Sequence, residues 1–247
     1  MQERYLGDVH DFHKFLFLKF IKKHSFLKLG LNFYHVNPQN LGNKELLKND
    51  GEKRKYLFDN TYKTFDKVMI KEFKNLTQKK RRKFTTFTNC THLKKYITFY
   101  YDEMKINKRE AWFKKSMEKL KDCEVIFLDP DNGLITKSIN KNSVQSLKFL
   151  LFEEIINIFN ANKILVFSQS QSYSKDHRTY VQEKINQIKR YSNLTVEHPV
   201  IRNRTSPNSF FFVISNNKYF NKMNNLIKNF AQFYNKVELI DPSIFVK

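Results

Sequence analysis

The chain has 247 residues, enough for one large α/β domain or two small ones with a full hydrophobic core. With 45 lysines and arginines against 24 acidic residues, its formal net charge is +21. This surplus favours RNA or DNA as a partner, because neutralised phosphates release counterions, although a composition rich in Lys, Asn, Ile and Phe could also produce it. No stretch of about 18 uncharged apolar residues occurs, so no membrane-spanning segment is expected.

The two cysteines, Cys90 and Cys123, lie far apart and outside any C-x-x-C pattern. They form neither a disulfide framework nor a zinc site by spacing, which predicts buried thiols and a reducing, cytoplasmic location.

The first half of the chain has few regular patterns. Residues 11–23 are typical of an apolar, basic first helix, and residues 31–36 are typical of a strand. We interpret residues 37–105 as an irregular, basic, insertion-like middle of one α/β domain that spans residues 1–247. The elements expected in this middle are a tight turn at 49–51, a helix at 62–76 and a strand at 97–101.

The second half of the chain alternates short apolar strands with amphipathic helices. This alternation predicts a three-layer α/β fold, with a mostly parallel sheet covered by helices on both faces. The expected strands are 124–128, 163–167, 194–198, 209–214 and 236–240, and the expected helices are 107–121, 143–159, 176–190 and 218–234.

The strongest candidate site is the loop Asp129-Pro130-Asp131-Asn132-Gly133, which directly follows an apolar strand. Ligands of open α/β sheets bind outside the carboxyl ends of the strands. Asp129 could accept a hydrogen bond from an amine of a bound base. Alternatively, Asp129 and Asp131 could hold Mg²⁺ or Mn²⁺, because hard cations prefer carboxylate oxygens. The same residue types also form ordinary turns.

A second candidate site lies at the start of the first helix, where Gly7 and Asp8 precede Asp11 and Lys14. Asp11 could cap the helix, and Lys14, on the same face, could pair with Asp11 or reach an anionic ligand. A cap with an ion pair explains the pattern equally well. If both candidate sites serve one ligand, Asp8 or Asp11 should lie within about 10 Å of Asp129.

Basic side chains in two segments are candidates for contact with nucleic-acid phosphates, and either segment could also be a solvated turn. No phosphate-binding Gly-x-x-x-x-Gly-Lys-Ser/Thr loop, no Gly-x-Gly-x-x-Gly and no Gly-x-Ser-x-Gly occurs, so these common nucleotide and hydrolase motifs are excluded. The basic residues are Lys79, Lys80, Arg81, Arg82 and Lys83 in the first segment, and Arg202 and Arg204 in the second.

The Gly7-Asp8-x-x-Asp11-x-x-Lys14 start, the Asp-Pro-Asp-Asn-Gly loop and Gln169 after the next strand resemble a family of uncharacterised bacterial and prophage proteins. That family is in turn similar to the adenine-N6 methyltransferases of large-subunit ribosomal RNA. Those enzymes begin with Gly-Asn-x-x-Asp-x-x-Lys and carry Asp-Pro-Pro-Tyr after a strand. They end in a strand, a helix and a closing strand, as residues 209–240 do here. The resemblance covers the start of the chain and most of its second half.

The resemblance implies a Rossmann-like, methyltransferase-like sheet with one antiparallel strand, at 209–214, near the C-terminus. It implies S-adenosylmethionine as the cofactor. Asp129 would accept a hydrogen of the target amine, and Pro130 would aim a backbone carbonyl at it. The residues of the methyl-donor or substrate pocket would be Gly7, Asp8, Asp11 and Lys14.

Some positions depart from the pattern of those enzymes. Asp131 replaces a second proline, and Asn132 replaces the aromatic residue on which an extruded adenine stacks. Residues 36–40 contain no glycine, where those enzymes cradle the cofactor on a glycine-rich segment. Our first hypothesis is an S-adenosylmethionine-dependent methyltransferase-like protein acting on nucleic acid. The alternatives are a metal-dependent nuclease or phosphodiesterase that uses Asp129 and Asp131, and a non-catalytic nucleic-acid-binding relative.

Overall fold

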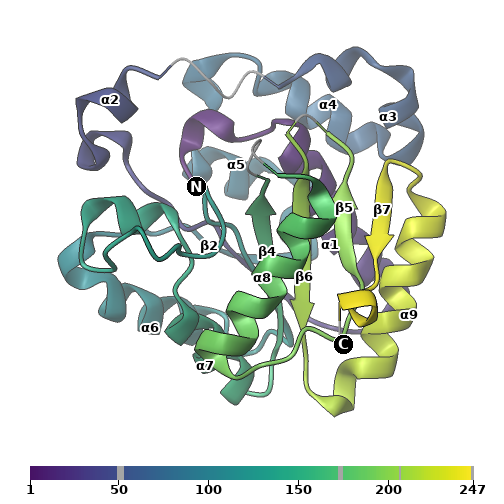
Figure 1. The fold of residues 1–247 in the computed structure, drawn as a ribbon. Helices are drawn as coiled ribbons and strands as arrows, with labels where there is room; N and C mark the ends of the chain where they lie inside the picture. Colours follow the sequence, from purple (N-terminus) through teal and green to yellow (C-terminus); the bar gives the residue numbers. More distant parts are fainter. Residues whose placement is uncertain (49–52, 172–174, 206, 246–247) are drawn as a thin grey trace.

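A computed structural model describes residues 1–48, 53–171, 175–205 and 207–245 of the chain. The turn expected at 49–51 lies outside the described residues. The centre of the structure is a seven-stranded sheet with the strand order β2-β1-β3-β4-β6-β5-β7 (Figure 1). The strands are β1 (Leu29–Asn32), β2 (Ile97–Tyr100), β3 (Val125–Leu128), β4 (Ile164–Ser170), β5 (Val200–Asn203), β6 (Ser209–Ile214) and β7 (Val237–Ile240).

The sheet is parallel in its first strands and mixed beyond them. β1 pairs in parallel with β2 and β3, and β3 pairs in parallel with β4. β6 pairs antiparallel with β4 and β5, and β7 pairs antiparallel with β5. The expected α/β, Rossmann-like fold is therefore confirmed. The sheet differs from the expected one in that two strands, β6 and β7, run against the others.

Helices cover the sheet, and Figure 1 shows α8 in front of the strands with α1 behind them. The short α2 belongs to the irregular segment at 37–105. The helices are α1 (Val9–His24), α2 (Asn43–Leu46), α3 (Asn60–Phe65), α4 (Lys67–Asn75), α5 (Phe84–Cys90), α6 (Arg109–Lys119), α7 (Phe152–Asn160), α8 (His177–Ser192) and α9 (Asn217–Phe233).

Two clusters of buried apolar side chains lie against the strands. Along β3 the side chains alternate between them: Val125 and Phe127 belong to the first cluster, Ile126 and Leu128 to the second. The first cluster includes residues of α1, α4, α5 and α9, and the second includes residues of α6, α7 and α8. Because successive side chains of a strand point to opposite faces, the two clusters cover opposite faces of the sheet.

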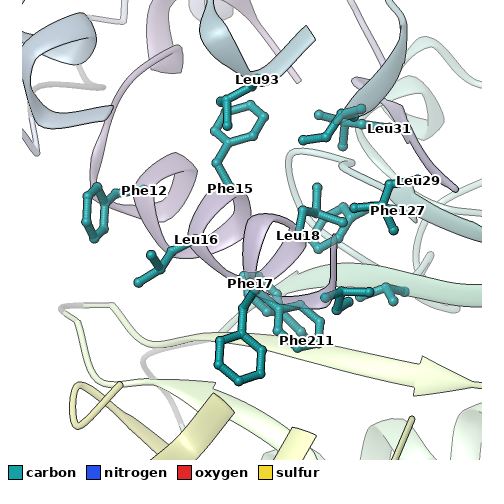
Figure 2. Packing of buried hydrophobic residues seen from close by; sticks show 14 of the residues in the cluster. Phe12, Phe15, Leu16, Phe17, Leu18, Leu29, Leu31, Leu93, Phe127 and Phe211 are labelled. Atoms are coloured by element: carbon teal, nitrogen blue, oxygen red, sulfur yellow. The ribbon is translucent and has the colours of Figure 1, made fainter. Parts of the chain in front are cut away.

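Helix α1 is buried along most of its length, as expected for a helix that is apolar on several faces. Figure 2 shows Phe15 and Phe17 of this helix among the residues of the first cluster, where Phe17 approaches Phe211 of β6. The ring centroids of Phe17 and Phe211 lie 5.9 Å apart, and those of Phe17 and Phe230 lie 4.9 Å apart. Burying one such side chain contributes about 1.5–3 kcal/mol, so this packing holds the whole helix against the sheet.

Two strands lie at residues other than those that the sequence predicts. β1 begins and ends earlier than the expected 31–36, in register with β2 and β3. The strand expected at 194–198 is wrong, because β5 is Val200–Asn203 and includes Arg202 of the second basic segment. The first run alternates in polarity and the second does not, but only the second lies between β6 and β7, and cross-strand partners decide which run pairs.

Two of the long helices expected from apolar spacing are interrupted. The helix expected at 62–76 divides into α3 and α4 at Asp66, whose side chain accepts a hydrogen bond from Met69 N at 3.0 Å. The helix expected at 143–159 divides into a short 3₁₀ segment and α7. At the start of α7, Glu154 accepts a hydrogen bond from Leu151 N at 2.9 Å. Acceptor side chains at helix starts compete with a continuous helix, and apolar spacing does not reveal this.

The middle of the chain contributes α4 and α5 to the first cluster. Cys123 is buried but Cys90 is exposed, so the expectation of a buried thiol is wrong for Cys90. In the part of the chain that the structure describes, no helix combines the length and apolar character needed to cross a membrane.

Candidate functional site

A cavity of about 310 Å³ lies beside the carboxyl ends of β3 and β4 and the first turn of α1. We call it the Asp129 cavity. Ligand sites of open α/β sheets lie outside the carboxyl ends of the strands, and the volume lies within the range of small-molecule sites. Among the residues that line the cavity are His10, Asp11, Lys14, Asp129, Ser168 and Ser209.

Lys14 connects the two candidate sites that the sequence suggested. Its Nζ lies 2.5 Å from Asp11 Oδ1 and 2.5 Å from Asp129 Oδ2, and its side chain is 2% exposed. Burial opposes the charge of Lys14, but the carboxylates of Asp11 and Asp129 outweigh burial and raise the pKa of Lys14 above its usual value. The structure therefore brings Asp11 and Asp129 to one ammonium group, although the two residues are far apart in sequence.

Hydrogen bonds within the start of α1 set the position of Asp11. Asp8, and not Asp11 as expected, caps the helix by accepting from His10 N at 2.9 Å and Asp11 N at 3.0 Å. Burial raises the pKa of Asp8 to about 6. Gly7 N donates to Asp11 Oδ2 at 2.7 Å. Gly7 has a φ of +80°, and a Cβ there would lie 2.7 Å from a side-chain atom of Leu76, so glycine is required.

The loop after β3 is held by a second set of contacts. Ser168 Oγ donates to Asp129 Oδ1 at 3.0 Å. Gln169 Nε2 donates to Asn132 O at 2.9 Å. Gly133 has a φ of +82°, and a Cβ there would lie 2.2 Å from Gln169 Oε1. Gln169, which the resemblance singled out, therefore supports the loop, and Gly133 permits its close approach.

His10 is a residue of the cavity that sequence analysis missed. Its Nδ1 lies 3.1 Å from Ser209 Oγ, across a separation of 199 residues in the chain. Burial is the main reason that the pKa of His10 falls to about 4. The ring is therefore neutral at pH 7. Nothing in the local pattern distinguishes His10 from the other histidines, because its partner belongs to β6.

Asp129 and Asp131 have different partners within the protein. Asp131 Oδ2 accepts from Gln2 Nε2 at 3.0 Å, whereas Asp129 binds Lys14 and Ser168. Across the described ranges, no group of three or more His, Cys, Asp or Glu side chains is placed to hold a metal ion.

The basic segment 79–83 borders a second cavity, of about 530 Å³, which shares Lys48 with the Asp129 cavity. Its members have different environments. Arg82 is 3% exposed and donates from Nε to a backbone carbonyl at 2.8 Å. Lys83 is exposed and pairs with Glu3 at 2.7 Å. The remaining members, Lys79, Lys80 and Arg81, are exposed at the surface.

The second basic segment is directed toward β7 and its neighbours. Arg202 Nη1 lies 2.7 Å from Glu238 Oε2, and Arg204 Nη2 donates to the backbone carbonyl of Asn235. Arg204 is exposed, whereas Arg202 is half-buried. An ion pair with Glu238 reduces the charge that Arg202 presents to a phosphate, so Arg204 is the stronger candidate of the two.

No protein-family model matches this chain, and no curated protein matches it either. The chemistry must therefore be inferred from the cavity. It combines the Asp129 carboxylate, held by an ammonium and a hydroxyl group, with the neutral imidazole of His10. Such a set can bind a polar, uncharged ring by accepting and donating hydrogen bonds.

Proposed function

We propose that the protein is an S-adenosylmethionine-dependent methyltransferase-like protein that acts on nucleic acid and receives the acceptor base in the Asp129 cavity. The observation that carries this proposal is the joining of Asp11 and Asp129 by Lys14. These residues come from the two segments on which the resemblance rests. A three-layer, methyltransferase-like arrangement belongs to the same proposal, and the two clusters on opposite faces of the sheet support it.

In this proposal Asp129 orients the target amine. Its side chain is 12% exposed, so part of the carboxylate reaches the cavity. The ammonium of Lys14 balances its charge, and Ser168 Oγ fixes one of its oxygens. A carboxylate held in this way accepts a hydrogen from an exocyclic amine without first reorganising, which is the main requirement for electrostatic preorganisation.

The lining of the Asp129 cavity carries charges of both signs, as S-adenosylmethionine does with its sulfonium, ammonium and carboxylate. Lys14 holds the carboxylates of Asp11 and Asp129, which leaves Asp8 and Asp131 to face the cationic groups of the cofactor. Lys48, Lys53 and Lys148 also line the cavity and suit the carboxylate of the cofactor. When bound, the cofactor supplies an electrophilic methyl group. The role of the protein is to bind it, to orient the amine and to exclude water.

The neighbouring cavity of about 530 Å³ suits a different part of the substrate. Arginine and lysine side chains make up much of its lining, among them Lys48, Lys79 and Lys83. Cationic side chains attract the phosphates of nucleic acid. We therefore place the nucleic-acid backbone at this cavity and the base at Asp129, with Lys48 between them.

Calorimetric titration with S-adenosylmethionine and with Mg²⁺ tests the proposal. Heat from the methyl donor is expected. Heat from Mg²⁺ alone would favour the nuclease alternative. Absence of both, with nucleic acid still bound, would favour a non-catalytic relative.

Asp129→Asn tests the site itself. It keeps the shape and removes the charge, so turnover should fall on the order of a hundredfold or more with the fold intact. Asp131→Asn should retain donor binding and substantial turnover, whereas a metal site needs both carboxylates. Asp122→Asn, at an exposed position, is the matched control. Equal activity of Asp129→Asn and the parent would contradict the site assignment.

A further inference from the structure

The ring of His10 is anchored to the sheet as well as to its own helix. His10 Nδ1 lies 3.1 Å from Ser209 Oγ, and Asn203 Nδ2 donates to the same oxygen at 3.2 Å. Ser209 belongs to β6 and Asn203 to β5, and both are buried. The contact with Ser209, which Asn203 holds in turn, orients the ring in the wall of the Asp129 cavity.

These contacts also determine which ring nitrogen carries the proton. Ser209 Oγ already accepts from Asn203, and among the described residues its remaining partner is His10 Nδ1. With Asn203 Nδ2 as a donor to Ser209, His10 Nδ1 is the acceptor available to the hydroxyl hydrogen, and in that arrangement the proton of the neutral ring lies on Nε2. Nε2 makes no hydrogen bond to a described residue and is not among the fully buried polar atoms. Its N–H is available to a ligand in the cavity.

The electrostatic surroundings keep this donor neutral. Burial and then Lys53 lower the pKa of His10 to about 4, and together they outweigh Asp11 and Asp129, which act in the opposite direction. Lys14 lowers it further. The cavity thus offers an uncharged N–H donor at His10 and a carboxylate acceptor at Asp129.

We propose that His10 is a specificity-determining residue, whose Nε2–H donates to a ring nitrogen of the base whose amine hydrogen is accepted by Asp129. The matching ligands carry an exocyclic amine beside an acceptor nitrogen, as adenine and cytosine do, whereas uracil and thymine present a carbonyl in place of the amine. This inference rests on the proposed binding of a base at Asp129, but it does not require methyl transfer.

Nucleosides that lack only the acceptor nitrogen test this role by NMR titration. The probes are adenosine against 1-deazaadenosine and 7-deazaadenosine, and cytidine against 3-deazacytidine, which all keep the amine. A buried donor without its acceptor is costly, so the parent protein should bind adenosine or cytidine about tenfold more tightly than a matching deaza analogue. His10→Phe keeps a ring and removes the N–H, and it should bind each pair alike.

Two further variants separate this role from a structural one. His10→Gln restores an N–H donor and should recover part of the discrimination that His10→Phe loses. His24→Phe changes an exposed histidine of the same helix and should leave the discrimination intact.

The outcomes separate the two proposals. Equal affinity of the parent protein for a nucleoside and all its deaza analogues overturns the role of His10, while loss of binding in Asp129→Asn still supports the proposed function. Unchanged binding in Asp129→Asn overturns the proposed function. Failure of the parent protein to bind any of these nucleosides overturns both.

Discussion

Two buried ion pairs in this molecule invite comparison, because only one of them belongs to the candidate site. Lys14 lies between Asp11 and Asp129. Arg109 of α6 binds Glu154 of α7 through two contacts, of 2.8 and 2.9 Å. Both pairs border cavities: the Lys14 pair borders the Asp129 cavity of about 310 Å³, and the Arg109 pair borders a cavity of about 690 Å³. Neither burial nor ion pairing therefore distinguishes a ligand site from a structural contact.

The two pairs differ in what surrounds the charges. Arg109 also donates to the carbonyls of Ser146 at 2.9 Å and Phe149 at 2.6 Å, and Tyr34 Oη donates to Glu154 at 3.0 Å. These bonds link loops and helices and satisfy the polar atoms of the pair. Beside Lys14, in contrast, a partly exposed carboxylate and an accessible imidazole nitrogen face one cavity. The comparison teaches that unused hydrogen-bonding capacity indicates a site better than buried charge does.

The largest effect on stability is expected when the Arg109–Glu154 pair is broken. Arg109→Met leaves Glu154 buried without its cation, and removing one partner of a buried pair costs about 3–5 kcal/mol. Urea denaturation should show that loss in the free energy of unfolding. Nucleoside affinity of the folded protein should not change. A loss of affinity without a loss of stability would reverse the roles that we assign to the two pairs.

Lys14→Met should lower binding as well as stability. It leaves the buried carboxylate of Asp11 and the partly exposed carboxylate of Asp129 without their shared cation. Asp129 would also lose its fixed orientation, so nucleoside affinity should fall by about tenfold or more. Lys23→Met, at an exposed position of the same helix, is the control. Unchanged affinity in Lys14→Met would place Lys14 with Arg109 as a structural residue.

The pH dependence of stability tests the burial of His10 in the Asp129 cavity. Unfolded His10 binds a proton near its usual pKa of 6.5, but folded His10 does so only near 4. Between these values the unfolded state binds more protons, so stability present above pH 6.5 is lost as the pH falls toward 4. This shift corresponds to about 3 kcal/mol.

His10→Phe should therefore lose less stability than the parent protein when denaturation is measured at about pH 7 and again at about pH 4.5. The difference should approach 2 kcal/mol, as an order-of-magnitude value derived from the shift. His24→Phe should follow the parent protein. Identical curves for His10→Phe and the parent would show that His10 is not shielded from protons.

The smallest effect concerns an exposed charge near the site. Lys80 lies in the basic segment 79–83, and its replacement by alanine removes at most one phosphate contact. The slope of log affinity for duplex nucleic acid against log salt should decrease in magnitude by about 0.9. Arg82→Ala should lower stability instead, because that side chain is buried on backbone carbonyls. A salt slope near zero for the parent protein would show that its charge does not act in binding.

Local patterns determined much of this protein before any contact was known. The apolar run before Asp129 predicted β3, the turn residues after it predicted the loop, and the apolar content of residues 11–23 predicted a buried first helix. These features follow from side-chain periodicity and turn chemistry, which act over a few residues. They placed Asp129 at the carboxyl end of a strand, where the structure has the cavity.

Only the tertiary structure decided which residues meet in that cavity. Residues 194–198 alternate in polarity, yet residues 200–203 form the strand, because they have partners in β6 and β7. Asp8 replaced Asp11 as the cap, and Arg82 turned inward although its neighbours are exposed. His10 became part of the site through Ser209, and Lys14 through Asp129, 115 residues away. Strand order brings such residues together, and it depends on packing across the whole chain, which local periodicity does not contain.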